Sequence, residues 1–378
     1  MAKKKNVFIK ILNDSLIDGL INSNISYLYN FGVLLGVGFI MQIISGILCS
    51  FYFIGTMDDA FSSVEVLMRN ISNGSVMRYW LANGVSIIFV LLYTLIFRNL
   101  YYGSYMKRRS TLFITGVIIL LLSIVIAFLG YSLVCGIQSY WAIVVITNLL
   151  SSIRYIGGDI VVWIWSNYSR STLTIRRFYS LLYLLRFIIV GMIISLIIAL
   201  LELAGTTLIG TSGNTSMVSF LSAFTIKDMY RILIYVLIVG VVINKYRVKF
   251  QDAENNIEFN SLVTRSAIVR LWYLLSYYAI LRSISNKLLG VLAMLFSILS
   301  LGILPFNNCS LVRSNRFNLI NRLLLFIFCA NFIILMILGA KLAAEPFITV
   351  AQIAGAFLFS YLIFFISISS AFNNLFIF

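Results

Sequence analysis

Long apolar runs recur along the whole chain, and they constrain its fold more than any other feature. Each run has roughly the length of the 20 or so residues that a helix needs to cross the hydrocarbon core of a membrane. Hydrophobic residues make up 61% of the chain, against 11% for charged residues. The sequence therefore predicts an all-α integral membrane protein with eight transmembrane helices, at about 31–54, 76–97, 111–134, 178–203, 227–243, 288–306, 320–340 and 347–369.

The segments between these runs differ in character. Residues 1–30 mix apolar residues with turn formers, which predicts an N-terminal surface segment. Residues 135–175 are too polar and irregular to span a membrane, yet they are rich in Trp and Tyr. These aromatic side chains favour the membrane–water interface. We therefore expect interfacial helices at about 137–168.

Basic residues outnumber acidic ones by 28 to 12, which gives a formal net charge of +16. The basic residues form short clusters between apolar runs, at 3–5, 107–109, 176–177 and 245–249. This placement is typical of anchors at a membrane surface, where anionic lipid supplies the counter-charge. The lipid bilayer is therefore the predicted partner, and nucleic acid is not.

The residues that usually bind metals are scarce. The sequence has no histidine, and its four cysteines show no CxxC spacing. Without imidazole, histidine-based metal sites, histidine acid–base catalysis and haem ligation by two histidines are all excluded. We interpret the cysteines as buried free thiols and predict no metal site.

Two pairs of glycines share one spacing. Gly32 and Gly46 are 14 residues apart in the first run, and Gly116 and Gly130 are 14 apart in the third. Fourteen residues of helix rise about 21 Å, or about four turns, so each pair lies near one face at two depths. Glycines inside membrane helices mark the close approach of another backbone or of a flat ligand. The pairs predict either a slot with two levels or helix packing alone.

Several phrases together resemble cytochrome b, the membrane core of the quinol–cytochrome c oxidoreductase (complex III), and its mitochondrial, fungal members above all. They are RYWLANG at 78–84, LYYGSY at 100–105, SYWAIVVITNLLSSI at 139–153, GGDIVVWIW at 157–165 and YAILRSISNKLLGV at 278–291. The resemblance implies eight transmembrane helices. The first four, within 31–203, form a bundle around two stacked haems, and residues 204–378 form a C-terminal membrane domain of four further spans.

The resemblance also assigns residues to sites. It implies that Gly32, Gly46, Gly116 and Gly130 let porphyrins approach the helices, and that Arg78 lies near a haem propionate. The histidine ligands of the family match Leu81, Leu95, Leu182 and Leu196 here. The glutamate of the outer quinol site matches Leu271. The remaining quinone-site candidates are Lys227, Asp228, Tyr131, Trp272, Tyr273 and Tyr278.

The family moves electrons between quinol and quinone through two b haems. Because leucine cannot donate an electron pair to iron, we predict a haem-free chain that is not redox-competent by itself. It would serve as a scaffold with at most vestigial quinone binding. The resemblance implies a homodimeric complex with Rieske iron–sulfur and cytochrome c1-type subunits in the mitochondrial inner membrane.

Two alternatives remain open. One is a redox-active cytochrome b with unrecognised ligation, or a redesigned sequence. The other is a transporter or channel that uses Arg186, an arginine within the fourth apolar run, in a polar pathway. An intramembrane arginine is energetically costly, which favours a functional or ion-paired role. Snorkelling to the surface, or facing a polar cleft, is the competing interpretation.

Overall fold

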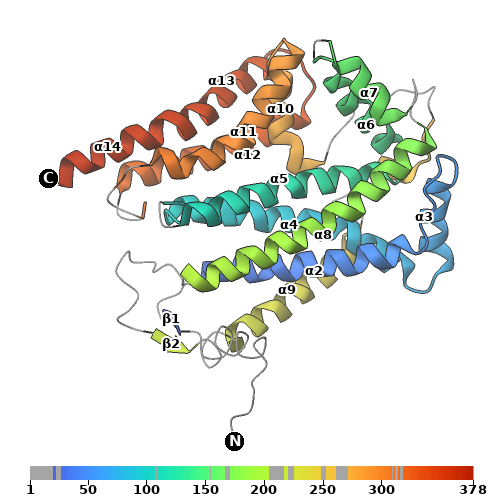
Figure 1. The fold of residues 1–378 in the computed structure, drawn as a ribbon, viewed down its shortest axis with the longest axis horizontal. Helices are drawn as coiled ribbons and strands as arrows, with labels where there is room; N and C mark the ends of the chain where they lie inside the picture. The colour runs from blue at the N-terminus through green and yellow to red at the C-terminus, as the bar shows by residue number, and fades with distance from the viewer. Residues whose placement is uncertain are drawn as a thin grey trace, which may run out of the picture.

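The computed structural model describes most of the chain. The described residues are 20–22, 27–106, 109–153, 155–166, 171–203, 217–219, 225–247, 253–260, 271–308, 310, 314–315 and 318–377. Most of the predicted surface segment at 1–30 lies outside these ranges. Helices dominate the described residues, which confirms the predicted all-helical membrane class (Figure 1).

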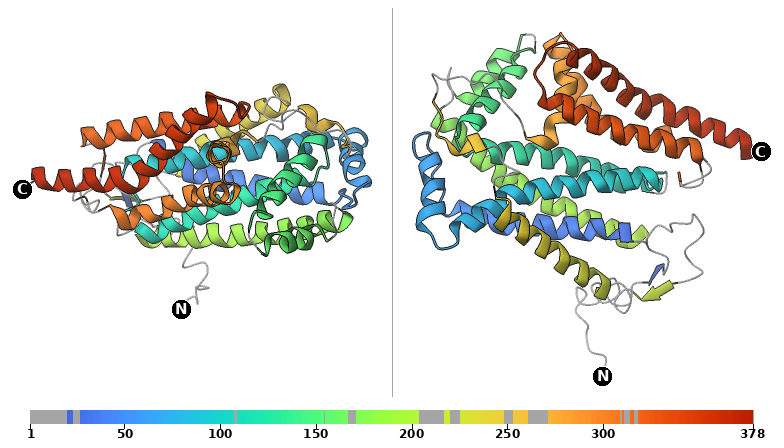
Figure 2. Two further views of the ribbon diagram at one scale, coloured as in Figure 1. Left: turned by 90° about the horizontal axis from the view of Figure 1, so that it is seen from above. Right: turned by 180° about the vertical axis from the view of Figure 1, so that it is seen from behind.

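Four long helices form the first group. They are α2 (Phe31–Ser50), α4 (Gly74–Tyr101), α5 (Ser110–Ser132) and α8 (Thr172–Leu203). Helix α2 packs against α4, and α5 packs against α8. Seen from above and from behind, the axes of these helices are roughly aligned with one another (Figure 2). Their apolar sequences explain the arrangement, because neither lipid nor a neighbouring helix requires a polar face.

The C-terminal part forms a second group beside α5. It consists of α10 (Leu275–Ser283), α11 (Lys287–Asn307), α12 (Leu319–Ala340), α13 (Phe347–Ser360) and α14 (Ile366–Ile377), with a π-helical turn at Tyr361–Phe365 between the last two. The short helix α10 packs against both α11 and α12, and α11 packs against α5. The second group is therefore attached to the first through α5 and α11.

Shorter helices lie near one end of the bundle. They are α3 (Asp59–Asn70), α6 (Ile137–Leu150) and α7 (Gly157–Trp165) (Figure 1). The last two fall within the range expected for interfacial helices. Near the opposite end, the strands β1 (Leu20–Asn22) and β2 (Met217–Ser219) form an antiparallel pair that the sequence analysis did not anticipate.

Among the described residues, seven helices are long and apolar enough to cross a membrane. The expected fifth span corresponds to α9 (Ile226–Lys245), which is not one of the seven. Four charged residues, Lys227, Asp228, Arg231 and Lys245, lower the apolar character of α9. By length it still equals α2, since both have 20 residues.

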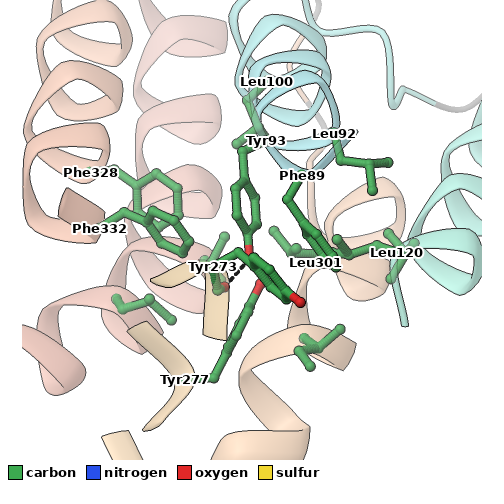
Figure 3. Close-up of a cluster of buried hydrophobic side chains, with 14 of the residues drawn as sticks. Phe89, Leu92, Tyr93, Leu100, Leu120, Tyr273, Tyr277, Leu301, Phe328 and Phe332 are labelled. Carbon is green, nitrogen blue, oxygen red and sulfur yellow. Dashed lines mark hydrogen bonds between the residues drawn. The ribbon is translucent and has the colours of Figure 1, made fainter. Parts of the chain in front are cut away.

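The largest hydrophobic core lies where the two groups meet. Tyr93 of α4 faces Phe332 of α12, and Phe89 of α4 packs on Tyr273 (Figure 3). Tyr93 meets Phe332 edge to face, with ring centroids 5.2 Å apart. Aromatic pairs of this kind add about 0.5–1.5 kcal/mol beyond the area that they bury. The core therefore ties α4 to the C-terminal helices.

We predict that Gly339→Ala destabilises the contact between α10 and α12. A Cβ atom at Gly339 would lie 2.8 Å from the carbonyl carbon of Leu275, which is backbone and cannot rotate away. Overpacking of this kind costs about 1–3 kcal/mol. Thermal unfolding in detergent measures the loss. Gly302→Ala on α11 is the control, because no atom lies within 4 Å of the added methyl group. Equal unfolding temperatures for the two variants would contradict the prediction.

Candidate functional site

A cavity of about 230 Å³ opens between the four helices of the first group, next to α3. Each helix contributes one residue that the resemblance implied for the haem slot, and we call these four residues the outer level. They are Gly46 from α2, Leu81 from α4, Gly130 from α5 and Leu182 from α8. The structure thus brings together four predicted residues that are separated by up to 136 positions in the sequence.

Side-chain ends occupy the space beside the two glycines of the outer level. At Gly130, a Cβ atom would lie 3.5 Å from Cδ1 of Leu182. At Gly46, a Cβ atom would lie 2.7 Å from Cζ of Arg186, so the guanidinium of α8 reaches across to α2. Glycine at 46 therefore makes room for this guanidinium. The position of Arg186 at this cavity inside the bundle argues against snorkelling to the surface.

The inner level is arranged differently. Gly32 lies beside Leu95, with 3.9 Å between the Gly32 Cβ position and Cδ1 of Leu95. Gly116 has no atom within 4 Å of its Cβ position. Leu196 is partly buried and packs against the large core. None of these four residues lines the outer cavity, so the structure separates the two predicted levels.

Three residues expected at the outer quinol site also lie at this cavity. Tyr131, Leu271 and Tyr273 all line it. Tyr273 stacks on Phe89 with ring centroids 4.0 Å apart and an interplanar angle of 5°. The hydroxyl of Tyr93 donates a hydrogen bond of 2.6 Å to the backbone carbonyl of Tyr273 (Figure 3). Tyr93 was not predicted as a site residue, because only the folded chain places it beside Tyr273.

Other aromatic candidates lie around the cavity without lining it. The indole Nε1 of Trp272 donates to Oγ of Ser86 at 3.1 Å. The ring of Tyr278 lies under the guanidinium of Arg282, 5.2 Å from its Cζ. Burial raises the pKa of Tyr277, although its hydrogen bond with Tyr93 acts in the opposite direction. The Tyr277 hydroxyl therefore stays protonated at neutral pH and keeps its proton for hydrogen bonding.

The inner quinone-site candidates lie on the first turn of α9. The side-chain amide of Asn30 donates a hydrogen bond to the carboxylate of Asp228. An Nη1 atom of Arg231 lies 3.7 Å from the same carboxylate. Lys227 is exposed next to them. Asn30 could not be predicted as a partner of Asp228, because the two residues are 198 positions apart in the sequence. Arg231 could be, because residues three apart on a helix lie on the same face.

Two family profiles match the sequence over most of its length. Residues 16–205 match "Cytochrome b/b6/petB", and residues 258–359 match "Cytochrome b(C-terminal)/b6/petD". Cytochrome b of Saccharomyces cerevisiae is 40% identical over 372 residues, covering 98% of this chain and 97% of the relative. The chain belongs to the cytochrome b family. This finding confirms the resemblance drawn from the sequence phrases.

Further comparisons agree with this membership. Cytochrome b of Mycena viridimarginata is 41% identical over 375 residues, covering 99% of this chain and 96% of the relative. A solved structure described as "Hyperthermophilic respiratory Complex III" matches with a TM-score of 0.90 at 25% identity, covering 98% of both chains. The chain is thus a cytochrome b of the respiratory complex III type, embedded in a membrane.

The prediction that the chain binds no haem is wrong, because membership of the cytochrome b family implies b-type haem. The outer cavity suits a porphyrin in two respects, because Gly46 and Gly130 line it and Arg78 lines it as well. It does not fit the bis-histidine mode, since leucine stands at 81, 95, 182 and 196 and the sequence has no histidine. The prediction was wrong because it treated iron coordination by residues at these four positions as the only way to bind a haem.

We predict that Tyr93→Phe lowers the stability by about 1 kcal/mol, since it removes the hydroxyl that donates to the Tyr273 carbonyl. Thermal unfolding in detergent measures the change. Thr94→Val is the matched control, because the Thr94 hydroxyl donates only to the Val90 carbonyl of its own helix. A local bond of this type stabilises little. An equal loss in both variants would refute a special role for the Tyr93 contact.

Proposed function

We propose that this cytochrome b is the membrane scaffold of a complex III assembly and binds quinone beside Asp228. The observation that carries the proposal is the extent of the structural match, which covers 98% of the chain at a TM-score of 0.90. A fold kept over this length supports the role of a membrane subunit in such an assembly. Fungal relatives at about 40% identity support placement in the mitochondrial inner membrane.

The contacts of Asp228 support quinone binding at the inner site. Its carboxylate is half-buried at the start of α9, between the amide of Asn30 and the guanidinium of Arg231. A carboxyl group within hydrogen-bond reach of a quinone oxygen can, once protonated, transfer its proton to that oxygen, and geometry decides this before pKa does. The adjacent cation of Lys227 adds positive charge where a reduced quinone would carry negative charge.

The outer site has lost its proton acceptor. Leu271 lines the cavity at the position that the resemblance matches to the family glutamate, and no Asp or Glu is among the described residues that line it. The tyrosines at 131 and 273 still offer aromatic surface for a quinone ring. We therefore assign proton-coupled quinone binding to the inner site and apolar ring binding to the outer one.

Quinone binding can be tested by charge removal at Asp228. We expect Asp228→Asn to weaken the binding of a short-chain ubiquinone about tenfold, measured by equilibrium dialysis of the purified protein. The variant keeps the size of the side chain and removes its charge. Asp159→Asn on α7 is the control, because Asp159 is exposed and likewise lies in the first turn of its helix. An unchanged affinity in the Asp228 variant would refute the inner site.

The scaffold role predicts stable partners. Capture of the chain from digitonin-solubilised mitochondrial membranes should recover iron–sulfur and cytochrome c1-type subunits in constant proportion. The mass of the captured complex should correspond to a dimer of assemblies. Recovery of the chain alone, in a particle of monomer mass, would overturn the scaffold role without affecting quinone binding.

A further inference from the structure

The end of helix α4 is completed by a residue that lies far along the chain. The last carbonyl groups of a helix have no partner within the helix itself. At the end of α4, the backbone amide of Asn315 donates to the Tyr101 carbonyl at 3.1 Å. The side-chain amide of Asn315 donates to the Leu100 carbonyl at 3.0 Å, across 215 positions of sequence. Asn315 therefore fixes the end of α4 through two hydrogen bonds.

A small pocket of about 10 Å³ lies at this junction. Its lining comes from the end of α4, the turn after it, Asn315, α12, the π-helical turn and α14. Four of the lining residues, Leu100, Tyr105, Tyr361 and Ser369, are buried. None of the described residues that line it also lines the outer cavity. The pocket is therefore a separate feature, at the place where the two helical groups meet.

One polar atom of a lining residue is left without a partner. Oδ1 of Asn321, in the first turn of α12, is buried and accepts no hydrogen bond from the described residues. A buried acceptor in this state loses its hydration without compensation, which is unfavourable. Native proteins pair such atoms either with protein groups or with ordered water. Asn321 therefore indicates a hydrogen-bond donor at the pocket.

Tyr105 offers a matching donor at the same pocket. Its hydroxyl accepts a hydrogen bond of 2.7 Å from Nδ2 of Asn308. Burial raises the pKa of Tyr105 to about 12, so the hydroxyl keeps its own proton at neutral pH. Within the described part of the chain, no acceptor is recorded for that proton. The pocket thus has a lone acceptor on α12 and a lone donor on the turn after α4.

We propose that the pocket binds one ordered water molecule, which donates to Oδ1 of Asn321 and accepts from the hydroxyl of Tyr105. A buried water needs a volume of about 10–15 Å³ and two to four polar partners. The pocket has room for one water and no more. Because Asn321 belongs to α12 and Tyr105 follows α4, this water joins the two helical groups through hydrogen bonds.

A density map of the purified protein, at a resolution that shows ordered water at other buried polar groups, tests the site directly. We expect one peak in the pocket, about 2.7–3.0 Å from both Oδ1 of Asn321 and the Tyr105 hydroxyl. This measurement needs no variant. A map that shows buried water elsewhere but no peak here would overturn the proposal, as would a direct hydrogen bond between Asn321 and Tyr105.

The sign of a stability change gives a second test. Asn321→Leu keeps a similar side-chain volume and removes the acceptor. If water bridges the two residues, the variant leaves the Tyr105 donor unpaired, and the unfolding temperature in detergent should fall by about 2 °C. If the pocket holds no water, the substitution removes an unpaired buried acceptor and the unfolding temperature should rise. A rise would contradict the proposal.

A double-mutant cycle shows whether the two side chains share one bridge. The loss of unfolding temperature in Asn321→Leu combined with Tyr105→Phe should be smaller than the sum of the two single losses. The control pairs Tyr105→Phe with Asn331→Leu. Asn331 also lies on α12, but it donates to the Ala354 carbonyl and does not line the pocket. Its losses should add.

Additive losses in both pairs would refute the bridge. None of these measurements involves quinone or partner subunits, so their outcome is independent of the Asp228 and capture experiments.

Discussion

Every backbone amide and carbonyl in a membrane must find its partner inside the protein, and this requirement governs the whole molecule. It makes the long apolar runs helical, but it does not hold the helices together, because lipid is as apolar as leucine. The association of the helices therefore depends on close packing and on a few polar contacts. Gly339 against the backbone of Leu275 is a contact of the first kind. The amide of Asn331, which donates to the Ala354 carbonyl at 2.9 Å, is a contact of the second kind.

The same two kinds of contact shape the candidate sites. In the C-terminal group and at α4, aromatic rings fill the space between helices, as at Tyr93 and Phe332. In the first group, glycines leave space instead, and the cavity lies beside two of them. The difference is one of side-chain volume, because a glycine that faces a flexible neighbour leaves room that a rotamer change can open. Packing thus fills the space between α4 and the C-terminal group and leaves a cavity between the helices of the first group.

Much of this could be predicted from the sequence, because it depends on local composition. The span positions follow from apolar runs, and the 14-residue spacing places the glycines of each helix at two depths, although only the structure shows that Gly46 and Gly130 line the same cavity. What could not be predicted depends on distant pairing. Asn30 meets Asp228 across 198 residues, and only the packing of α8 against the bundle places the Arg186 guanidinium beside Gly46. The strand pair near the N-terminus is a long-range contact as well.

The prediction about the cofactor failed for a different reason. Leucine at the four ligand positions removes coordination by histidine, and residue identity shows that directly. The free energy of haem binding, however, combines iron coordination, apolar packing and contacts to the carboxylates of the haem. The loss of one contribution does not remove the others. The family comparison corrected the inference because it depends on the whole chain rather than on four positions.

Charge distinguishes the outer level from the inner level of the slot. Two arginines, Arg78 and Arg186, line the outer cavity, and the guanidinium of Arg186 lies beside Gly46, while at the inner level leucine lies beside Gly32. Apolar packing is stable in lipid without any ligand, but guanidinium groups without counter-charge are not. The electrostatic demand of the bundle is therefore concentrated at the outer level.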